Sequence, residues 1–346
     1  MRVGAFQPQF DRLASLFFFW RRAHSWFCCA LVLAACAAPA HARQIQVKGQ
    51  PYIDLDLVGR SFGMQPYWLK GYKTFRLRSQ WTTVDVDKKS RVLKMNGMPV
   101  YLGFPTVESQ GALFIAEADY RHVLQSLLTP QVFPDVPALR RIVLDPGHGG
   151  RDSGAINPAY GLEEKELALD VSLRLKTLLE EGGYEVVLTR NDDRYIPLEQ
   201  RPRIANRARA DLFVSIHFNA AASSSASGFE TFALTPQHQA SSQFRNVTAA
   251  DAVSYMGNAF DPWNTLLGYA LQRSLVHHGG GPDRGLKRAR FLVLKHLQCP
   301  GVLVELGFMS HSESARKMRS NVYRQTLAQS LFDGIVLYHQ RIQRIQ

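Results

Sequence analysis

The chain has 346 residues, of which 46% are hydrophobic and only 20% are charged, so it can form a globular core, and its length favours two domains. The formal net charge of +12 favours acidic partners such as envelope polymers or anionic surfaces. The sequence has no zinc-finger cysteine pattern, no aromatic RNA-binding signature and no dense basic block. We therefore expect no nucleic acid among its partners.

The first 42 residues have the three-part pattern of a secretory signal. A short apolar stretch follows Arg21 and Arg22, and an Ala-His-Ala sequence stands directly before Arg43. The apolar core is shorter than the roughly 20 residues that a transmembrane helix needs. We therefore predict that residues 1–42 are a signal peptide and that the protein is exported to the periplasm or cell envelope.

The cysteines leave an alternative type of signal open. The sequence LAAC, which ends at Cys36, is similar to a lipoprotein box, so the protein would contact the membrane only if Cys36 carries a lipid. A twin-arginine signal fits the residues after Arg22 poorly. Three of the four cysteines lie in the signal, and the mature chain keeps only Cys299 and can form no internal disulfide.

Residues 43–128 contain short β-type runs separated by turn residues, which predicts a small α+β module. This region resembles the small module at the N-terminus of copper amine oxidases, which also occurs in bacterial envelope proteins. The resemblance implies an envelope-binding or spacer role and, by itself, no copper site. Residues 129–138 contain three prolines and are predicted to be a linker.

Residues 139–346 alternate between β-type runs and amphipathic segments, which is typical of an α/β domain. We predict a largely parallel, twisted sheet with helices on both faces. In such a sheet the functional site lies outside the carboxyl ends of the strands. The predicted strands are RIVLD, YEVVLTR, LFVSIHF, FETFAL and GVLVELGF, and the predicted helices span residues 164–181, 198–209, 265–276 and 320–339.

Two histidines stand at the ends of predicted strands. His148 follows IVLD within the turn DPGHGG, where the glycines allow a tight backbone path. His217 comes near the end of LFVSIHF and is followed by a loop of small residues. Either histidine alone would more often be a hydrogen-bonded structural residue, but two of them at two strand ends favour a shared site.

Two glutamates stand in apolar surroundings. Glu164 lies on the apolar stripe of the predicted helix over residues 164–181, whereas the adjacent Glu163 does not. A position at the positive end of the helix dipole would explain Glu164, and so would a metal, because a buried carboxylate needs a partner. Glu305 stands inside the apolar run GVLVELGF, where a charge indicates either a site or a salt bridge to a core arginine.

Two histidines and one glutamate as ligands, with a second glutamate as base, form a recurrent arrangement of hydrolytic zinc sites. The chain has no HExxH sequence, so these ligands must come from separate elements. The residues alone therefore predict a zinc hydrolase with its site at the strand ends.

The region from about residue 140 to residue 340 carries seven motifs, namely DPGHGGRDSGA, EEKELAL, LTRNDDRYIPLEQRPRIAN, SIHFNA, GFETFAL, RGLKRARFLVL and PGVLVELGFMSH. In combination they resemble the zinc-dependent N-acetylmuramoyl-L-alanine amidases of the type involved in bacterial cell separation. The resemblance says nothing about the N-terminal region.

The resemblance implies one Zn²⁺ bound by His148, Glu164 and His217, with Glu305 as the general base. It also implies the bond that is cut, the amide between the lactyl group of N-acetylmuramic acid and L-alanine of the peptidoglycan stem peptide. Two alternatives stay open, a peptidoglycan-binding protein without catalytic activity and a zinc peptidase that cuts within the stem peptide.

Asn219 and Arg284 are further candidates for substrate binding beside the site. Residues 236–264 form a long segment, and in some relatives this region carries a helix that blocks the zinc until a protein partner removes it. We expect a wall of the groove here, with autoinhibition by Asp251 or Asp261 as the alternative.

For other polar residues we expect supporting or structural roles. Asp145 is expected to support His148 from behind, and Arg201 is expected to bind neighbouring backbone or carboxylates. His277 and His278 look like a metal pair, but a cationic helix terminus is the favoured interpretation.

Overall fold

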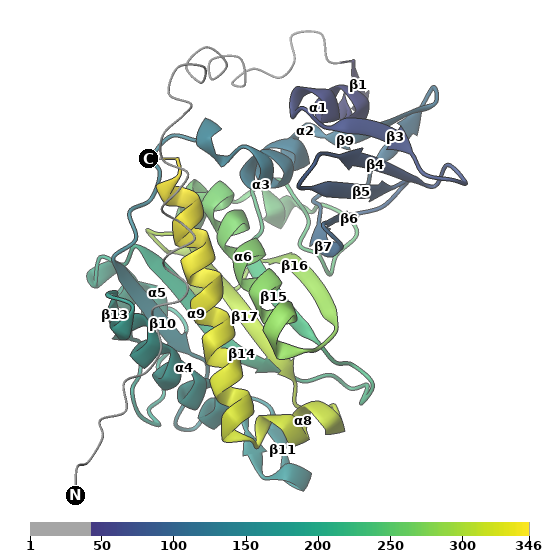
Figure 1. Ribbon diagram of the computed structural model, residues 1–346. Helices are drawn as coiled ribbons and strands as arrows, with labels where there is room; N and C mark the ends of the chain where they lie inside the picture. Colours follow the sequence, from purple (N-terminus) through teal and green to yellow (C-terminus); the bar gives the residue numbers. More distant parts are fainter. Residues whose placement is uncertain (1–42, 346) are drawn as a thin grey trace, which may run out of the picture. The chain divides into compact units, whose positions relative to one another are not determined.

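The computed structural model describes residues 43–345, so the predicted signal peptide lies outside the described residues. The strands that carry the motifs are β10 (Arg141–Pro146), β13 (Glu185–Leu188), β14 (Leu212–Asn219), β15 (Phe229–Leu234), β16 (Asp283–Ala289) and β17 (Gly301–Phe308). They lie in the order β13-β10-β14-β17-β15-β16 (Figure 1). Neighbours are parallel except that β15 runs antiparallel to β17. The predicted largely parallel sheet is confirmed.

Helices cover both faces of this sheet, as predicted. They are α4 (Glu164–Glu181), α5 (Gln200–Arg207), α6 (Asp261–Gly279), α7 (Leu292–Lys295), α8 (Ser312–Met318) and α9 (Asn321–Gln343). Helices α4, α6 and α9 pack on one face, where α9 crosses the sheet in Figure 1, and α5 and α7 pack on the other. Among residues 43–345, no helix is long and apolar enough to cross a membrane.

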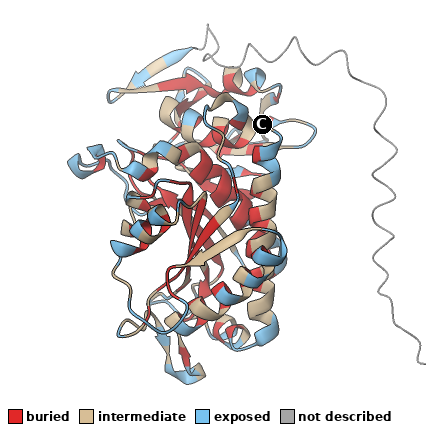
Figure 2. Cartoon of the chain, turned by 90° about the vertical axis from the view of Figure 1, so that its left-hand side faces the viewer, coloured by how far each residue is buried: buried red, intermediate tan, exposed pale blue. Residues whose placement is uncertain are grey.

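Alternating side chains of the strands divide between two cores. In β14, Val214 and Ile216 belong to the larger core under α4, α6 and α9, whereas Phe213 belongs to the smaller core under α5 and α7. Because successive strand residues point to opposite faces, His217 shares a face with Phe213. Figure 2 shows the sheet strands mostly buried, with exposed residues on the outer helices and loops.

Residues 43–128, called the N-terminal half below, are built of antiparallel strands and short helices. A four-stranded sheet has the order β1-β2-β9-β8, and the strands β3 to β7 form a meander. The bounds are β1 (Gln44–Val47), β2 (Gln50–Asp54), α1 (Leu55–Ser61), β3 (Gln65–Trp68), β4 (Thr74–Arg78), β5 (Thr83–Asp87), β6 (Val92–Met95), β7 (Met98–Tyr101), β8 (Val107–Ser109), β9 (Ala112–Ala116), α2 (Glu117–Asp119), the π-helix η1 (Tyr120–Gln125) and α3 (Ser126–Leu128).

Strand β7 joins the N-terminal half to the edge of the larger sheet. It pairs in parallel with β16 at Val100 and Leu286, so the eleven strands from β13 to β3 form one sheet. Arg91 donates hydrogen bonds from the N-terminal half to the carbonyls of Ala240, at 2.9 Å, and Phe244. The pairing covers an edge that would otherwise expose unpaired backbone groups.

Candidate active site

The turn after β10 places His148 at the carboxyl ends of the parallel strands. The backbone φ of His148 is +59°, and the next two glycines also have positive φ, which is a path that few side chains tolerate. Two buried arginines hold the carbonyls of this turn. Arg190 donates to Pro146 at 3.1 Å and to Gly147 at 2.6 Å, and Arg201 donates to Pro146 and to His148, both at 2.9 Å.

Asp145 supplies a negative charge beneath these arginines. It is fully buried and accepts hydrogen bonds from Arg201 at 2.9 Å, from Thr189 at 2.6 Å and from Ser215 at 2.7 Å. A buried charge needs such partners to offset the loss of water. Asp145 therefore supports His148 through Arg201, whose contacts are those of the structural role expected for it.

Glu164 is the first residue of α4 and points inward. Its side chain is buried, and its carboxylate accepts hydrogen bonds from the backbone amides of Ala155, at 2.8 Å, and Phe218, at 3.1 Å. The neighbouring Glu163 is half-buried and lies 3.5 Å from Lys165. The helix stripe thus predicted correctly which of the two glutamates is buried.

His148, Glu164 and His217 converge on one point. Oε1 of Glu164 lies 2.9 Å from Nδ1 of His217 and 3.1 Å from Nε2 of His148. One ligand-type atom of each residue lies within 4.8 Å of the others, so the three side chains could share a metal ion. Burial alone would raise the pKa of Glu164, but the hydrogen bonds from the two histidines outweigh it and hold this pKa far below its usual range.

Asp152 lies behind His148. Its Oδ2 is 2.9 Å from Nδ1 of His148 but is not in line for a good hydrogen bond. Burial acts to lower the pKa of His148, and the nearby carboxylates of Glu164 and Asp152 overcome this and raise it. The arrangement of a carboxylate, a histidine and a candidate metal position is typical of sites in which the outer carboxylate orients the ligand.

Glu305 lies in the strand next to His217. The register pairs Glu305 with His217 on β14 and with Glu230 on β15, so three polar side chains form one row across the sheet. Oε2 of Glu305 is shielded from solvent and has no hydrogen-bond partner among the described residues. Burial, with the charges of Glu164 and Glu230, raises the pKa of Glu305 well above its usual range. No salt bridge to a core arginine explains this carboxyl group within residues 43–345.

A cavity of about 440 Å³ opens beside Glu305. Both sequence-predicted substrate-binding residues, Asn219 and Arg284, line it. So does Tyr101 of β7, which comes from the N-terminal half. The remaining lining residues include Ala220, Ala221, Glu230, Phe232, Ser242, Gln243, Lys287, Arg288, Ala289, Phe291 and Phe308.

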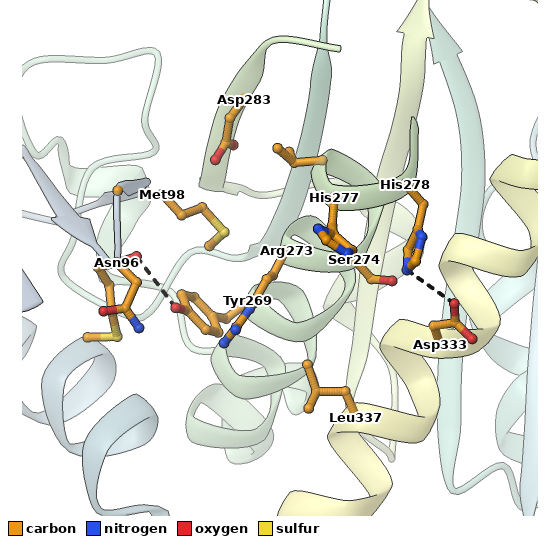
Figure 3. A pocket seen from close by; sticks show the side chains of 13 residues that line it. Asn96, Met98, Tyr269, Arg273, Ser274, His277, His278, Asp283, Asp333 and Leu337 are labelled. Atoms are coloured by element: carbon orange, nitrogen blue, oxygen red, sulfur yellow. Dashed lines mark hydrogen bonds and ion pairs between the residues drawn. The ribbon is translucent and has the colours of Figure 1, made fainter. Parts of the chain in front are cut away.

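A second cavity, of about 590 Å³, lies away from this row, between the β6–β7 turn and helices α6 and α9. Figure 3 shows His277 and His278 in its wall, with His278 paired to Asp333 of α9 at 3.3 Å. In the described part of the chain these two histidines belong to no group of three metal-ligand side chains. They lie in the last turn of α6, where cationic side chains are favourable.

The segment from residue 236 to residue 264 does not block the candidate metal group through either predicted residue. Asp251 lies 2.5 Å from Arg290 and caps a short 3-10 helix, η4 (Ala249–Ala252). Asp261 begins α6 in a buried position, and burial raises its pKa to about 7. Both carboxylates bind partners within or beside the segment, so the structure gives no support to the alternative that one of them blocks the metal group. Ser242 and Gln243 of this segment line the cavity beside Glu305, in agreement with the expected groove wall.

Three residues of this region escaped the sequence analysis as individuals. Arg190 stands in the motif LTRNDDR, Glu230 in GFETFAL and Lys287 in RGLKRARF, so the motifs contained a signal for each. Their contacts depend on which strands are neighbours, which the local pattern does not reveal. Tyr101 carried no signal at all, since it belongs to another predicted domain.

Fold and site together define an α/β domain in which a candidate metal group lies beside Glu305, whose Oε2 has no hydrogen-bond partner among the described residues. The chain belongs to the N-acetylmuramoyl-L-alanine amidase family, whose model matches residues 142–336.

Curated relatives carry the same description. The chain is 38% identical over 198 residues to the amidase LytC of Bacillus subtilis, a match that covers 57% of this chain and 35% of the relative. It is 35% identical over 218 residues to the amidase AmiC of Escherichia coli O6:H1, covering 57% of this chain and 52% of the relative. The chain thus spans about half or less of the length of these two relatives. The amidase AmiA of Escherichia coli K12 is 31% identical, with 58% of this chain and 76% of the relative covered.

A solved structure has a similar fold. The CwlD amidase from Clostridioides difficile, in complex with the GerS lipoprotein, aligns with a TM-score of 0.50 and 27% identity. The alignment covers 58% of this chain and 99% of that one.

Proposed function

We propose that this protein is a zinc-dependent peptidoglycan hydrolase that cleaves the amide between the lactyl group of N-acetylmuramic acid and L-alanine of the stem peptide. The observation that carries the proposal is the position of Glu305 one strand away from His217 of the metal group, with an Oε2 that has no hydrogen-bond partner among residues 43–345. We infer which amide bond is cut from the chain's membership of the amidase family.

The donor set fits zinc. Imidazole nitrogens and a carboxylate oxygen are ligands that zinc prefers, and catalytic zinc sites commonly have three protein ligands. The two backbone amides that hold Glu164 fix its carboxylate toward both histidines without neutralising it. We propose that Nε2 of His148, Nδ1 of His217 and the Glu164 carboxylate hold one zinc ion.

The chain's own residues would carry the proton and orient the substrate. Bound zinc would supply Lewis-acid chemistry, polarising the scissile carbonyl and lowering the pKa of the attacking water. Glu305 takes the proton of that water and passes it to the leaving nitrogen of L-alanine. Its Oε2 has no competing hydrogen-bond partner among residues 43–345, which suits this role. Asn219 and Arg284 contact the substrate from the cavity wall.

The purified protein, incubated with peptidoglycan, is expected to release stem peptides with a free N-terminal L-alanine, detected by mass spectrometry. A chelator should stop the release, and added zinc should restore it. Cuts within the stem peptide would instead establish a peptidase. Binding of peptidoglycan without any cleavage by the zinc-loaded protein would establish a non-catalytic binding protein.

Two glycines offer a matched test of the metal group. Gly154 and Gly161 have φ of +65° and +61°, so alanine at either position has the same backbone penalty of about 1–2 kcal/mol. A Cβ at Gly154 would lie 2.5 Å from Oε2 of Glu164 and 2.6 Å from Cδ2 of His148, whereas nothing lies within 4 Å of one at Gly161. We expect Gly154→Ala to lower zinc affinity by at least about tenfold, because it displaces two ligands. Equal zinc content of the two variants after dialysis would contradict this.

We further propose that the protein is exported through residues 1–42 and acts in the periplasm or cell envelope. We also propose domain boundaries at 43–128, 129–138 and 139–346, and envelope binding by the first of these regions. A protein activator is proposed because the similar CwlD structure was solved in complex with a lipoprotein. N-terminal sequencing and lipid analysis of the exported protein would test cleavage before Arg43 against lipidation at Cys36.

A further inference from the structure

In the wall of the cavity beside Glu305, the carboxylate of Glu230 pairs with two cations, Arg284 and Lys287. Glu230 is 3% exposed, and its Oε1 accepts a hydrogen bond from Nε of Arg284 and lies 3.0 Å from Nζ of Lys287. The pairing arises because β15 and β16 are parallel neighbours. Glu230 therefore fixes both cations in the wall of the cavity that Glu305 also lines.

Arg284 keeps its terminal nitrogens available. Within residues 43–345 no hydrogen bond involves its Nη atoms, and its side chain is 37% exposed. The guanidinium lies 4.9 Å from the ring centre of Phe308, so stacking and the Nε bond to Glu230 restrain it. A restrained guanidinium with a free pair of donors is suited to binding a carboxylate through two parallel hydrogen bonds.

Lys287 is held in a similar way. Its Nζ lies 5.6 Å from the ring centre of Tyr101 and 5.7 Å from that of Phe232, and its side chain is 14% exposed. An ammonium group has three donors, and among residues 43–345 only Glu230 forms an ion pair with this one. Through Tyr101, the N-terminal half thus contributes to the wall of the cavity and contacts Lys287.

Among the described residues, no other charged group of the cavity forms a salt bridge with these two cations. Arg288 is fully buried and turns its guanidinium to His122 and Thr265, at 3.1 and 2.7 Å. Glu305 lines the same cavity but forms no salt bridge with Arg284 or Lys287. A volume of about 440 Å³ lies within the range of cavities that bind small ligands.

We propose that Arg284 and Lys287, positioned by Glu230, bind the α-carboxylate of the second residue of the stem peptide, and thereby set the peptide's register beside Glu305. This inference rests on the proposed function. The stem peptide is the acidic part of the substrate, and a carboxylate one residue beyond L-alanine is close enough to the scissile amide to share one cavity with the catalytic carboxyl group.

The test uses the zinc-loaded Glu305→Gln protein, which is expected to bind without cleaving, and two synthetic muramoyl tripeptides. These differ only in the α-carboxyl of the second residue, D-glutamate, which is free in one and amidated in the other; the third residue is lysine and the terminus is amidated in both. Calorimetry should show at least about tenfold tighter binding of the free acid, and the preference should fall as salt is added.

Arg284→Gln and Lys287→Met, each added to the Glu305→Gln protein, should reduce this preference toward unity, and Lys287→Arg should retain it. Arg60→Gln removes a cation from an exposed ion pair with Asp56 and should leave the preference unchanged. Circular dichroism of each variant shows whether it has folded.

Equal binding of the two peptides, or a preference that survives loss of both cations, would overturn the inference. If the wild-type protein cleaves peptidoglycan while the peptides bind equally, only this inference fails. If it cleaves nothing with zinc bound, the proposed function fails whatever the peptides show.

Discussion

Glu305→Gln is expected to lower the rate of stem-peptide release by about 10²–10⁴-fold while zinc remains bound. Glutamine has the shape of glutamate but cannot take a proton from the attacking water. The side chain of Glu305 is not part of the His148, Glu164 and His217 group, so the ligands stay in place. Oε2 of Glu305 has no hydrogen bond within residues 43–345, so the amide replaces no internal contact of that atom. The measurement is single-turnover release of peptide, with zinc content determined on the same sample.

Glu313→Gln provides the matched control, because Glu313 is exposed on α8 and pairs with Lys317 at the surface. This variant should retain the wild-type rate. A Glu305→Gln protein that keeps more than about a tenth of the wild-type rate with zinc bound would exclude Glu305 as the general base. Loss of zinc from this variant would instead indicate that Glu305 supports the metal.

The places of four candidate residues in the fold could be predicted, because each place depends on a local sequence pattern. These residues are His148, Glu164, His217 and Glu305. Strand alternation and the glycine-rich turn located His148 at a strand end, and the helix stripe selected Glu164 over Glu163. The apolar run around Glu305 indicated a central strand, and β17 does lie between two other strands. Parallel strands end at a common edge, which is why residues far apart in the sequence were expected to meet.

What could not be predicted depends on the order of the strands. The antiparallel pairing of β15 with β17 brings Glu230 opposite Glu305, and no local pattern in GFETFAL specifies this neighbour. The partner of Lys287 follows from the register between β15 and β16 in the same way.

The pairing of the N-terminal half with the larger sheet could not be predicted either, because local sequence pattern does not reveal which strands are neighbours. Its strands were predicted as a separate module, since a sequence pattern identifies strands but not the edge on which they pair. The pairing of Val100 with Leu286 extends the larger sheet and brings Tyr101 into the cavity wall. Residues on both sides of the proposed domain boundary therefore line the candidate site, which the local pattern of either region does not reveal.

Arg201→Met is expected to lower the free energy of unfolding by about 3–5 kcal/mol, because it leaves the buried Asp145 charge without its cation. The carbonyls of Pro146 and His148 lose a donor as well. Arg203→Met, at an exposed position of the same helix, should change the stability by less than about 0.5 kcal/mol. Urea unfolding of the two variants measures the difference.

Asp145→Asn in the Arg201→Met background separates the charge from the carbonyl contacts. If the uncompensated carboxylate causes most of the loss, the double variant should be more stable than Arg201→Met alone, because the buried charge is gone. Arg190 would still hold the carbonyls of Pro146 and Gly147, but the carbonyl of His148 would lack its donor in both variants. We therefore expect His148 to be displaced and zinc affinity to be lowered in Arg201→Met and in the double variant alike, even where stability recovers. An Arg201→Met protein as stable as Arg203→Met would contradict the view that this buried pair holds the turn. Recovery of zinc affinity together with stability would show instead that the charge pair alone positions His148.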